Sequence, residues 1–85
     1  MMTQMAKTDE RRFNLNGRWV PVRTLDEGRV MWLSLRDAES LGASDMVRGC
    51  GEYREGGRVV AHVAYNGRMW VGAAREWTSA TQEIK

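Results

Sequence analysis

The chain is poor in the residues that build many familiar sites. Its 85 residues include one cysteine, one histidine and one proline. A single cysteine excludes an internal disulfide framework, and the absence of a Cys/His cluster excludes a structural zinc site. The longest apolar run, Val30 to Leu33, is too short to cross a bilayer. The N-terminal residues also lack the charged-then-apolar pattern of a signal peptide, so we expect a cytoplasmic protein without membrane contact, metal or cofactor.

The composition is that of an ordinary globular domain. The chain has 13 Lys plus Arg against 11 Asp plus Glu, 42% apolar residues and 28% charged residues. These values exclude a disordered chain and an acidic mimic of DNA. Eleven of the cations are arginines, whose planar heads suit carboxylates, phosphates and aromatic faces. Four tryptophans supply large apolar surfaces to a domain whose small size limits its core.

Turn chemistry predicts most of the strands. We expect a flexible tail over residues 1–10, a single α+β domain over 11–78 and a second flexible tail over 79–85. Within the domain, Asn16-Gly17, Gly56-Gly57 and Asn66-Gly67 each lie between β-prone segments. Such pairs favour two-residue hairpin turns, in which the central residues adopt positive φ.

The middle of the chain is expected to hold a third strand and then a helix. Asp26-Glu27-Gly28 is interpreted as a turn that leads into a strand over Arg29–Leu33. The Ser34-x-x-Asp37 spacing then predicts a helix start, and Gly42 is placed to end the helix. The predicted fold is β-β-β-α-β-β-β, a bent antiparallel sheet of five or six strands with one short helix. Several strands are apolar on both sides, so the uncovered face is expected to pack on a second sheet, to curl, or to meet another chain.

Residues suited to catalysis are few. Cys50 and His62 are the one pair that suggests a nucleophile with its base. Cys50 lies between two glycines and His62 lies in a valine-rich strand, which favours a loop thiol and a half-buried strand histidine. No glycine-rich loop carries the Lys and Ser/Thr of a phosphate site. We therefore expect a protein that is not an enzyme.

Arginine follows glycine four times, and each pair is predicted to lie at a hairpin. Arginines at strand starts, close to exposed aromatic residues, are typical of surfaces that bind single-stranded nucleic acid. Charges beside turns also keep sheet edges soluble and unpaired. The sequence leaves both interpretations open for these pairs: Gly17-Arg18, Gly28-Arg29, Gly57-Arg58 and Gly67-Arg68.

Two spaced motifs resemble a class of DNA-binding domain. They are Gly17-x-Trp19 and Trp32-x-Ser34-x-x-Asp37-Ala38. The stretch over residues 17–41 is similar to the arm-binding domains of phage integrases and to plant AP2-like domains. Those domains lay a three-stranded sheet in the major groove. The resemblance implies that five residues would lie near DNA: Arg18, Val20, Val22, Arg29 and Met31.

A second resemblance covers residues 35–76. A short helix leads into strands that end in the segment Asn66 to Glu76. This arrangement resembles the C-terminal part of some small type I anti-CRISPR proteins. Those are phage proteins that bind subunits of the CRISPR surveillance complex and block or misdirect its binding to target DNA. The resemblance implies a phage or mobile-element inhibitor that evades host defence by occupying a surface that handles nucleic acid.

The predicted function is accordingly protein–protein interaction with a host protein or nucleoprotein complex. Tryptophan and arginine most often dominate interface energetics. The partner-binding residues are predicted to be Arg18, Trp19, Arg58, Arg68 and Trp70. Two alternatives stay open: a small sequence-specific DNA-binding module of integrase-arm or excisionase type, and a structural domain that associates with a second copy of itself.

Overall fold

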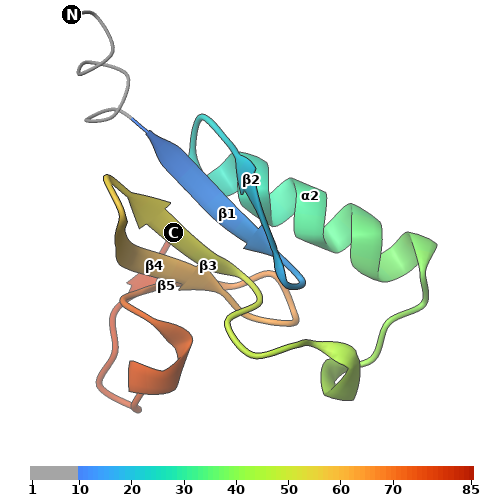
Figure 1. The fold of residues 1–85 in the computed structure, drawn as a ribbon. Helices are drawn as coiled ribbons and strands as arrows, with labels where there is room; N and C mark the ends of the chain where they lie inside the picture. The colour runs from blue at the N-terminus through green and yellow to red at the C-terminus, as the bar shows by residue number, and fades with distance from the viewer. Residues whose placement is uncertain (1–9) are drawn as a thin grey trace, which may run out of the picture.

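One α-helix packs on one face of a six-stranded antiparallel sheet in the computed structural model, which describes residues 10–85 (Figure 1). The helix α2 spans Leu25–Ala38, and two short 3-10 turns lie at η1, Ala43–Asp45, and η2, Ala74–Glu76. The strands are β1 Arg11–Leu15, β2 Arg18–Pro21, β3 Glu52–Glu55, β4 Arg58–Val63, β5 Met69–Val71 and β6 Glu83–Ile84. Their order across the sheet is β2-β1-β3-β4-β5-β6. No helix among residues 10–85 has the length and apolar character needed to span a membrane.

The α+β class, the antiparallel sheet and the single helix are confirmed, with one correction to the order. The third strand predicted over Arg29–Leu33 is wrong, because these residues lie inside α2. The hydroxyl of Thr24 accepts a hydrogen bond from the Glu27 N–H at 3.1 Å, and the Glu27 carboxylate accepts one from the Arg23 N–H at 2.6 Å. This reciprocal cap starts the helix at Leu25, well before the start predicted near Ser34.

The two-residue turns predicted at Asn16-Gly17 and Gly56-Gly57 are confirmed. Asn16 and Gly17 have φ of 50° and 103°, and Gly56 and Gly57 have φ of 59° and 84°. The two-residue turn predicted at Asn66-Gly67 is wrong, because the paired strands end at Val63 and Met69 and only Gly67 of the two turn residues has positive φ, at 92°. The predicted tail over residues 79–85 contributes β6, which pairs with β5 along the edge of the sheet. Of the predicted N-terminal tail, residues 1–9 lie outside the described residues.

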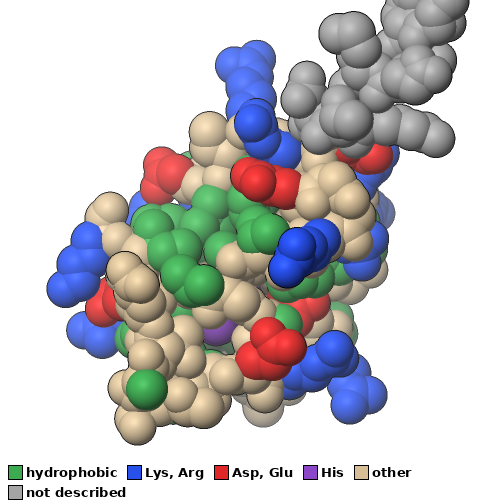
Figure 2. Space-filling view, turned by 90° about the vertical axis from the view of Figure 1, so that its left-hand side faces the viewer, with side chains coloured by type: hydrophobic (Ala, Val, Ile, Leu, Met, Phe, Trp, Pro, Cys, Tyr) green, Lys and Arg blue, Asp and Glu red, His purple; other side chains and the backbone are tan. Residues whose placement is uncertain are grey.

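The helix can lie close to the sheet because Gly28 has no side chain. A Cβ at Gly28 would overlap the ring of Phe13 on β1, so the helix backbone rests directly on that ring. Phe13, Trp32 and Val63 are the largest fully buried side chains and centre the core between α2 and the sheet. The opposite side of the molecule is not covered by α2. There, hydrophobic side chains lie among basic and acidic ones (Figure 2).

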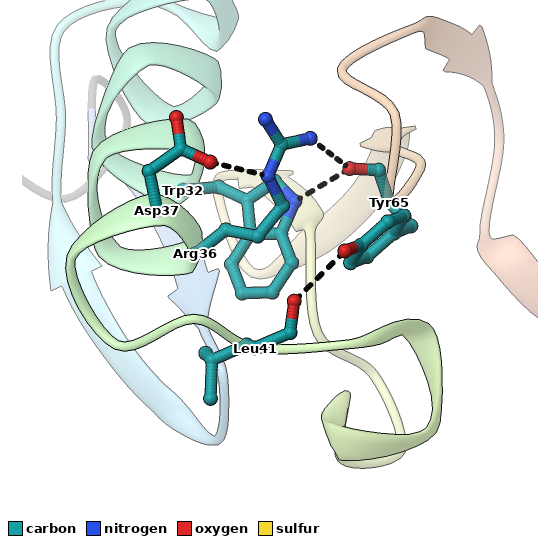
Figure 3. A network of polar contacts seen from close by, with 5 residues as sticks. All are labelled: Trp32, Arg36, Asp37, Leu41 and Tyr65. Carbon is teal, nitrogen blue, oxygen red and sulfur yellow. Dashed lines mark hydrogen bonds and ion pairs between the residues drawn. The ribbon is translucent and has the colours of Figure 1, made fainter.

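The helix also holds the connection between β4 and β5. The Trp32 indole N–H and the Arg36 guanidinium both donate to the Tyr65 carbonyl, at 3.3 and 2.9 Å. The Tyr65 hydroxyl donates to the Leu41 carbonyl at 2.8 Å, just beyond the end of the helix (Figure 3). The Tyr65 ring packs edge-on to Trp32 and under the Arg36 guanidinium. We call these contacts of Trp32, Arg36 and Leu41 with Tyr65 the Tyr65 clamp.

Replacing Gly28 with alanine is expected to destabilise the fold. Ala normally stabilises a helix interior by about 1 kcal/mol relative to Gly. Here the added methyl group overlaps Phe13, and overpacking of this kind costs roughly 1–3 kcal/mol. Urea unfolding of Gly28→Ala should therefore give a lower midpoint than the wild type. Ser34→Ala, at an exposed position of the same helix, is the control and should match or exceed the wild type. A Gly28→Ala chain as stable as the wild type would contradict the described packing.

Candidate binding surface

Strand pairing places a continuous row of side chains on the sheet face away from α2. Residues directly opposite each other in paired strands share a face, and residues alternate along each strand. Phe13 faces α2, so its neighbours Arg12 and Asn14 point to the other side. The register carries this side across all six strands. We call it the open face because α2 does not cover it, although Asn14 and His62 on it are buried. Its members include Arg12, Asn14, Trp19, Glu52, Arg54, His62, Trp70 and Glu83.

Tryptophans lie near both ends of the open face. On β2, the Trp19 ring lies under the Arg54 guanidinium, with 3.9 Å between the Arg54 Cζ and the ring centre. On β5, Trp70 packs edge-on against Trp77, with 5.6 Å between ring centres. Four strand spacings separate β2 from β5, or about 19 Å across the sheet. The open face therefore offers two separate aromatic contact points.

A cavity of about 370 Å³ lies at the β5 end of this face. Trp70 of β5 and Trp77, which directly follows η2, both line it, and Trp77 is 47% exposed. Residues of the β4–β5 turn form another part of its wall, and the Tyr65 clamp holds that turn in place. We call it the tryptophan pocket, and it is lined by Met46, Cys50, His62, Val63, Ala64, Asn66, Arg68, Trp70, Ala74 and Trp77.

One ring nitrogen of His62 is directed to the tryptophan pocket. The residue is 4% exposed, and its Nδ1 lies 2.8 Å from the Gly72 carbonyl oxygen. A carbonyl can only accept, so this contact selects the tautomer with the proton on Nδ1, in which Nε2 is the hydrogen-bond acceptor. Within residues 10–85, Nε2 makes no hydrogen bond, and Arg54 Nε is the one fully buried side-chain polar atom without a partner. His62 Nε2 therefore keeps its access to the pocket.

Cys50 lines the same pocket, but the pair lacks the features of a nucleophile with its base. Within the described residues no hydrogen bond joins Cys50 to His62. Burial raises the pKa of the Cys50 thiol, and a backbone hydrogen bond from Asn16 offsets this only in part. The thiol is therefore held protonated, whereas a catalytic cysteine is a thiolate. Residues 10–85 also contain no cluster of three or more His, Cys, Asp or Glu residues that could hold a metal ion.

The five predicted binding residues fall into separate places. Arg68 and Trp70 lie together at the tryptophan pocket, and Trp19 lies at the far end of the open face. Arg18 pairs with Leu15, two positions from Phe13, and so lies on the α2 side of the sheet. Arg58 pairs with Glu55 at the β3–β4 turn, also on the side of Phe13.

Three residues of this surface are not among the predicted binding residues: Arg54, His62 and Trp77. For His62, the sequence favours a half-buried strand histidine. The alternation of His62 with the valines of β4 was the signal that could have placed it on one face with Trp70. Gly28-Arg29 does not form a turn, because both residues lie within α2.

The set of residues expected near DNA does not form one surface. Val22 is buried in the core, and Val20 packs against it. Arg29 and Met31 lie on α2, on the far side of the sheet from the open face. The arrangement implied by the integrase-arm and AP2-like resemblance is therefore wrong for these side chains. No family model matches this chain, and neither the curated proteins nor the solved structures searched contain a match.

The environment of Cys50 predicts slow alkylation of its thiol. Burial and the raised pKa should make its reaction with iodoacetamide at pH 8 about tenfold or more slower in the folded chain than in urea. The rate is measured by mass spectrometry of the intact chain, with N-acetylcysteine as the reference in both solutions. A folded chain that reacts faster than N-acetylcysteine would reveal an activated thiolate and would contradict this description of the pocket.

Proposed function

We propose that this chain is a non-enzymatic protein that acts by binding a protein partner through its open face. The observation that carries the proposal is the tryptophan pocket, where Trp70 and the exposed Trp77 surround a cavity beside Arg68. Tryptophan and arginine are the residue types most enriched among interface hot spots. An uncovered aromatic surface of this kind marks a binding site more often than a simple solvated face.

The proposed partner is a subunit of a type I CRISPR surveillance complex, which the chain would inhibit as a phage or mobile-element protein. The resemblance over residues 35–76 supports this assignment. The mechanism would be steric: the open face would cover a surface that otherwise holds nucleic acid. Hairpins with two-residue turns and a helix packed directly on the sheet give a surface that loses little conformational freedom on binding.

The charges of the open face favour a protein partner over DNA. Glu52 lies opposite His62 in the β3–β4 register, and Glu83 lies opposite Trp70 in the β5–β6 register. A carboxylate therefore lies on each side of His62 and Trp70. Proteins that bind DNA gain most of their affinity by neutralising phosphates with Lys and Arg. A nucleic acid backbone bound across these residues would bring its phosphates close to the carboxylates of Glu52 and Glu83. Direct DNA binding is therefore an outcome that the experiment below must distinguish.

The test compares two arginines that both follow a glycine at a turn. Purified chain is mixed with type I surveillance complexes, and binding of the complexes to labelled target duplex is followed by mobility shift. The wild type should co-elute with a complex and reduce its target binding. Arg68→Glu, at the tryptophan pocket, should weaken that inhibition about tenfold or more. Arg58→Glu carries the same charge change on the other side of the sheet and should inhibit like the wild type.

The control outcomes are equally specific. Circular dichroism of both variants checks that each remains folded. Failure to co-elute with any type I complex would refute the proposed partner. Equal loss of inhibition in the two variants would refute the open face as the binding surface. Tight binding to the labelled duplex alone, with affinity falling steeply as salt rises, would replace the proposal with a DNA-binding module.

A further inference from the structure

We infer that the tryptophan pocket receives one tyrosine side chain of the partner protein, whose hydroxyl donates a hydrogen bond to His62 Nε2. This inference rests on the proposed function, because it names the group by which a protein partner is anchored. Four features of the pocket support it: the acceptor atom, the aromatic lining, the local charge and the volume.

The first feature is His62 Nε2, which calls for a hydrogen-bond donor on the ligand. His62 is almost fully buried, its Nδ1 proton is committed to the Gly72 carbonyl, and its Nε2 lone pair has no partner among residues 10–85. Nε2 is absent from the fully buried atoms of this part of the chain that lack a partner, so water can reach it while the pocket is empty. A ligand that enters the pocket displaces this water and must supply a hydrogen-bond donor of its own, because covering a polar atom without a partner is costly. A ligand without a donor would bury Nε2 unsatisfied.

The walls fit a flat ring. Trp70 and Trp77 meet edge to face at 86°, which leaves the face of one ring and the edge of the other directed to their surroundings. A third aromatic ring extends such an arrangement, because aromatic pairs favour edge-to-face and offset contacts. The Met46 side chain on the lining adds a polarizable sulfur, which also contacts rings favourably.

The charges around the pocket cancel. Arg68 at the lining lies 3.9 Å from the Glu83 carboxylate, and Glu52 lies beside His62 in the register. A nucleotide would bring phosphate toward these two carboxylates, and a lysine or arginine would meet Arg68. A neutral donor avoids both conflicts. Tyrosine carries its donor at the tip of a neutral ring, so that the ring can lie against the tryptophans while the hydroxyl reaches His62.

The size agrees with a single side chain and its adjoining backbone. At about 370 Å³ the pocket lies at the lower end of the range for small-ligand sites. The exposure of Trp77 places part of the lining at the molecular surface, where a partner side chain can reach it.

The experiment uses the full chain and small probes in place of the partner. N-acetyl-tyrosinamide is titrated into labelled protein and followed by NMR, with N-acetyl-phenylalaninamide as the matched probe that lacks the hydroxyl. Saturable shifts should fall on the indole N–H groups of Trp70 and Trp77. The tyrosine probe should bind roughly 3- to 10-fold tighter than the phenylalanine probe, which is the net contribution of one hydrogen bond. The ¹⁵N resonance of His62 Nε2 should move with the tyrosine probe and stay in place with the phenylalanine probe.

Variants separate the pocket from the rest of the molecule. Trp77→Ala removes an exposed lining side chain and should weaken the tyrosine probe severalfold. Val30→Ala, at an exposed position of α2 on the other side of the sheet, should leave it unchanged. Equal affinities of the two probes, shifts outside the pocket, or tighter binding of uridine monophosphate would each overturn the inference. If the probes fail while Arg68→Glu still selectively impairs inhibition of the surveillance complex, the proposed function stands without the tyrosine. If the probes bind as expected but no complex is captured, the proposed partner alone is refuted.

Discussion

The shape of the candidate binding surface depends on hydrogen bonds that side chains of α2 donate to carbonyls of the β4–β5 turn. A chain that leaves β4 and returns in β5 leaves the carbonyls of Tyr65 and Gly67 outside the ladder, and buried carbonyls must find donors. Trp32 and Arg36 donate to the Tyr65 carbonyl, and Arg29 donates to the Gly67 carbonyl at 3.0 Å. The three donors follow one side of α2 at spacings of three and four residues. Hydrogen bonds from a guanidinium are stronger than neutral ones, so the turn is held firmly.

Because α2 fixes the β4–β5 turn, it also fixes residues that line the tryptophan pocket on the opposite face of the sheet. The turn carries Asn66 and Arg68, both of which line the tryptophan pocket. The side chain of Asn66 accepts from the Arg68 N–H at 3.0 Å, which stiffens the turn from within. Helix packing on one face and pocket shape on the other are therefore linked through a few residues of backbone. The single helix covers one face only and leaves the other face of the sheet without a covering helix.

The turns of this fold could be predicted from sequence because they are local. Asn16-Gly17 and Gly56-Gly57 adopt positive φ for reasons contained in the residues themselves. The helix start was also encoded, in Thr24 and Glu27, but the β-prone run Val30–Leu33 and the apparent turn at Gly28 obscured it. Gly28 is needed for close approach to Phe13, a tertiary reason that a local pattern does not contain. β6 has two residues and exists only because β5 lies beside it.

The candidate site could be predicted only where its residues are close together in the sequence. Arg68 and Trp70 are two residues apart on an extended segment, so their shared side followed from strand geometry. The convergence of Cys50, His62 and Trp77 did not, because it requires the chain to return over the sheet after β5. Within the described residues, Cys50 and His62 share this pocket without a hydrogen bond between them. The Gly72 carbonyl accepts from Nδ1, so Nε2 is the ring nitrogen left as an acceptor for a group that enters the pocket. Burial raises the pKa of the Cys50 thiol, and these features together support the binding role that we propose.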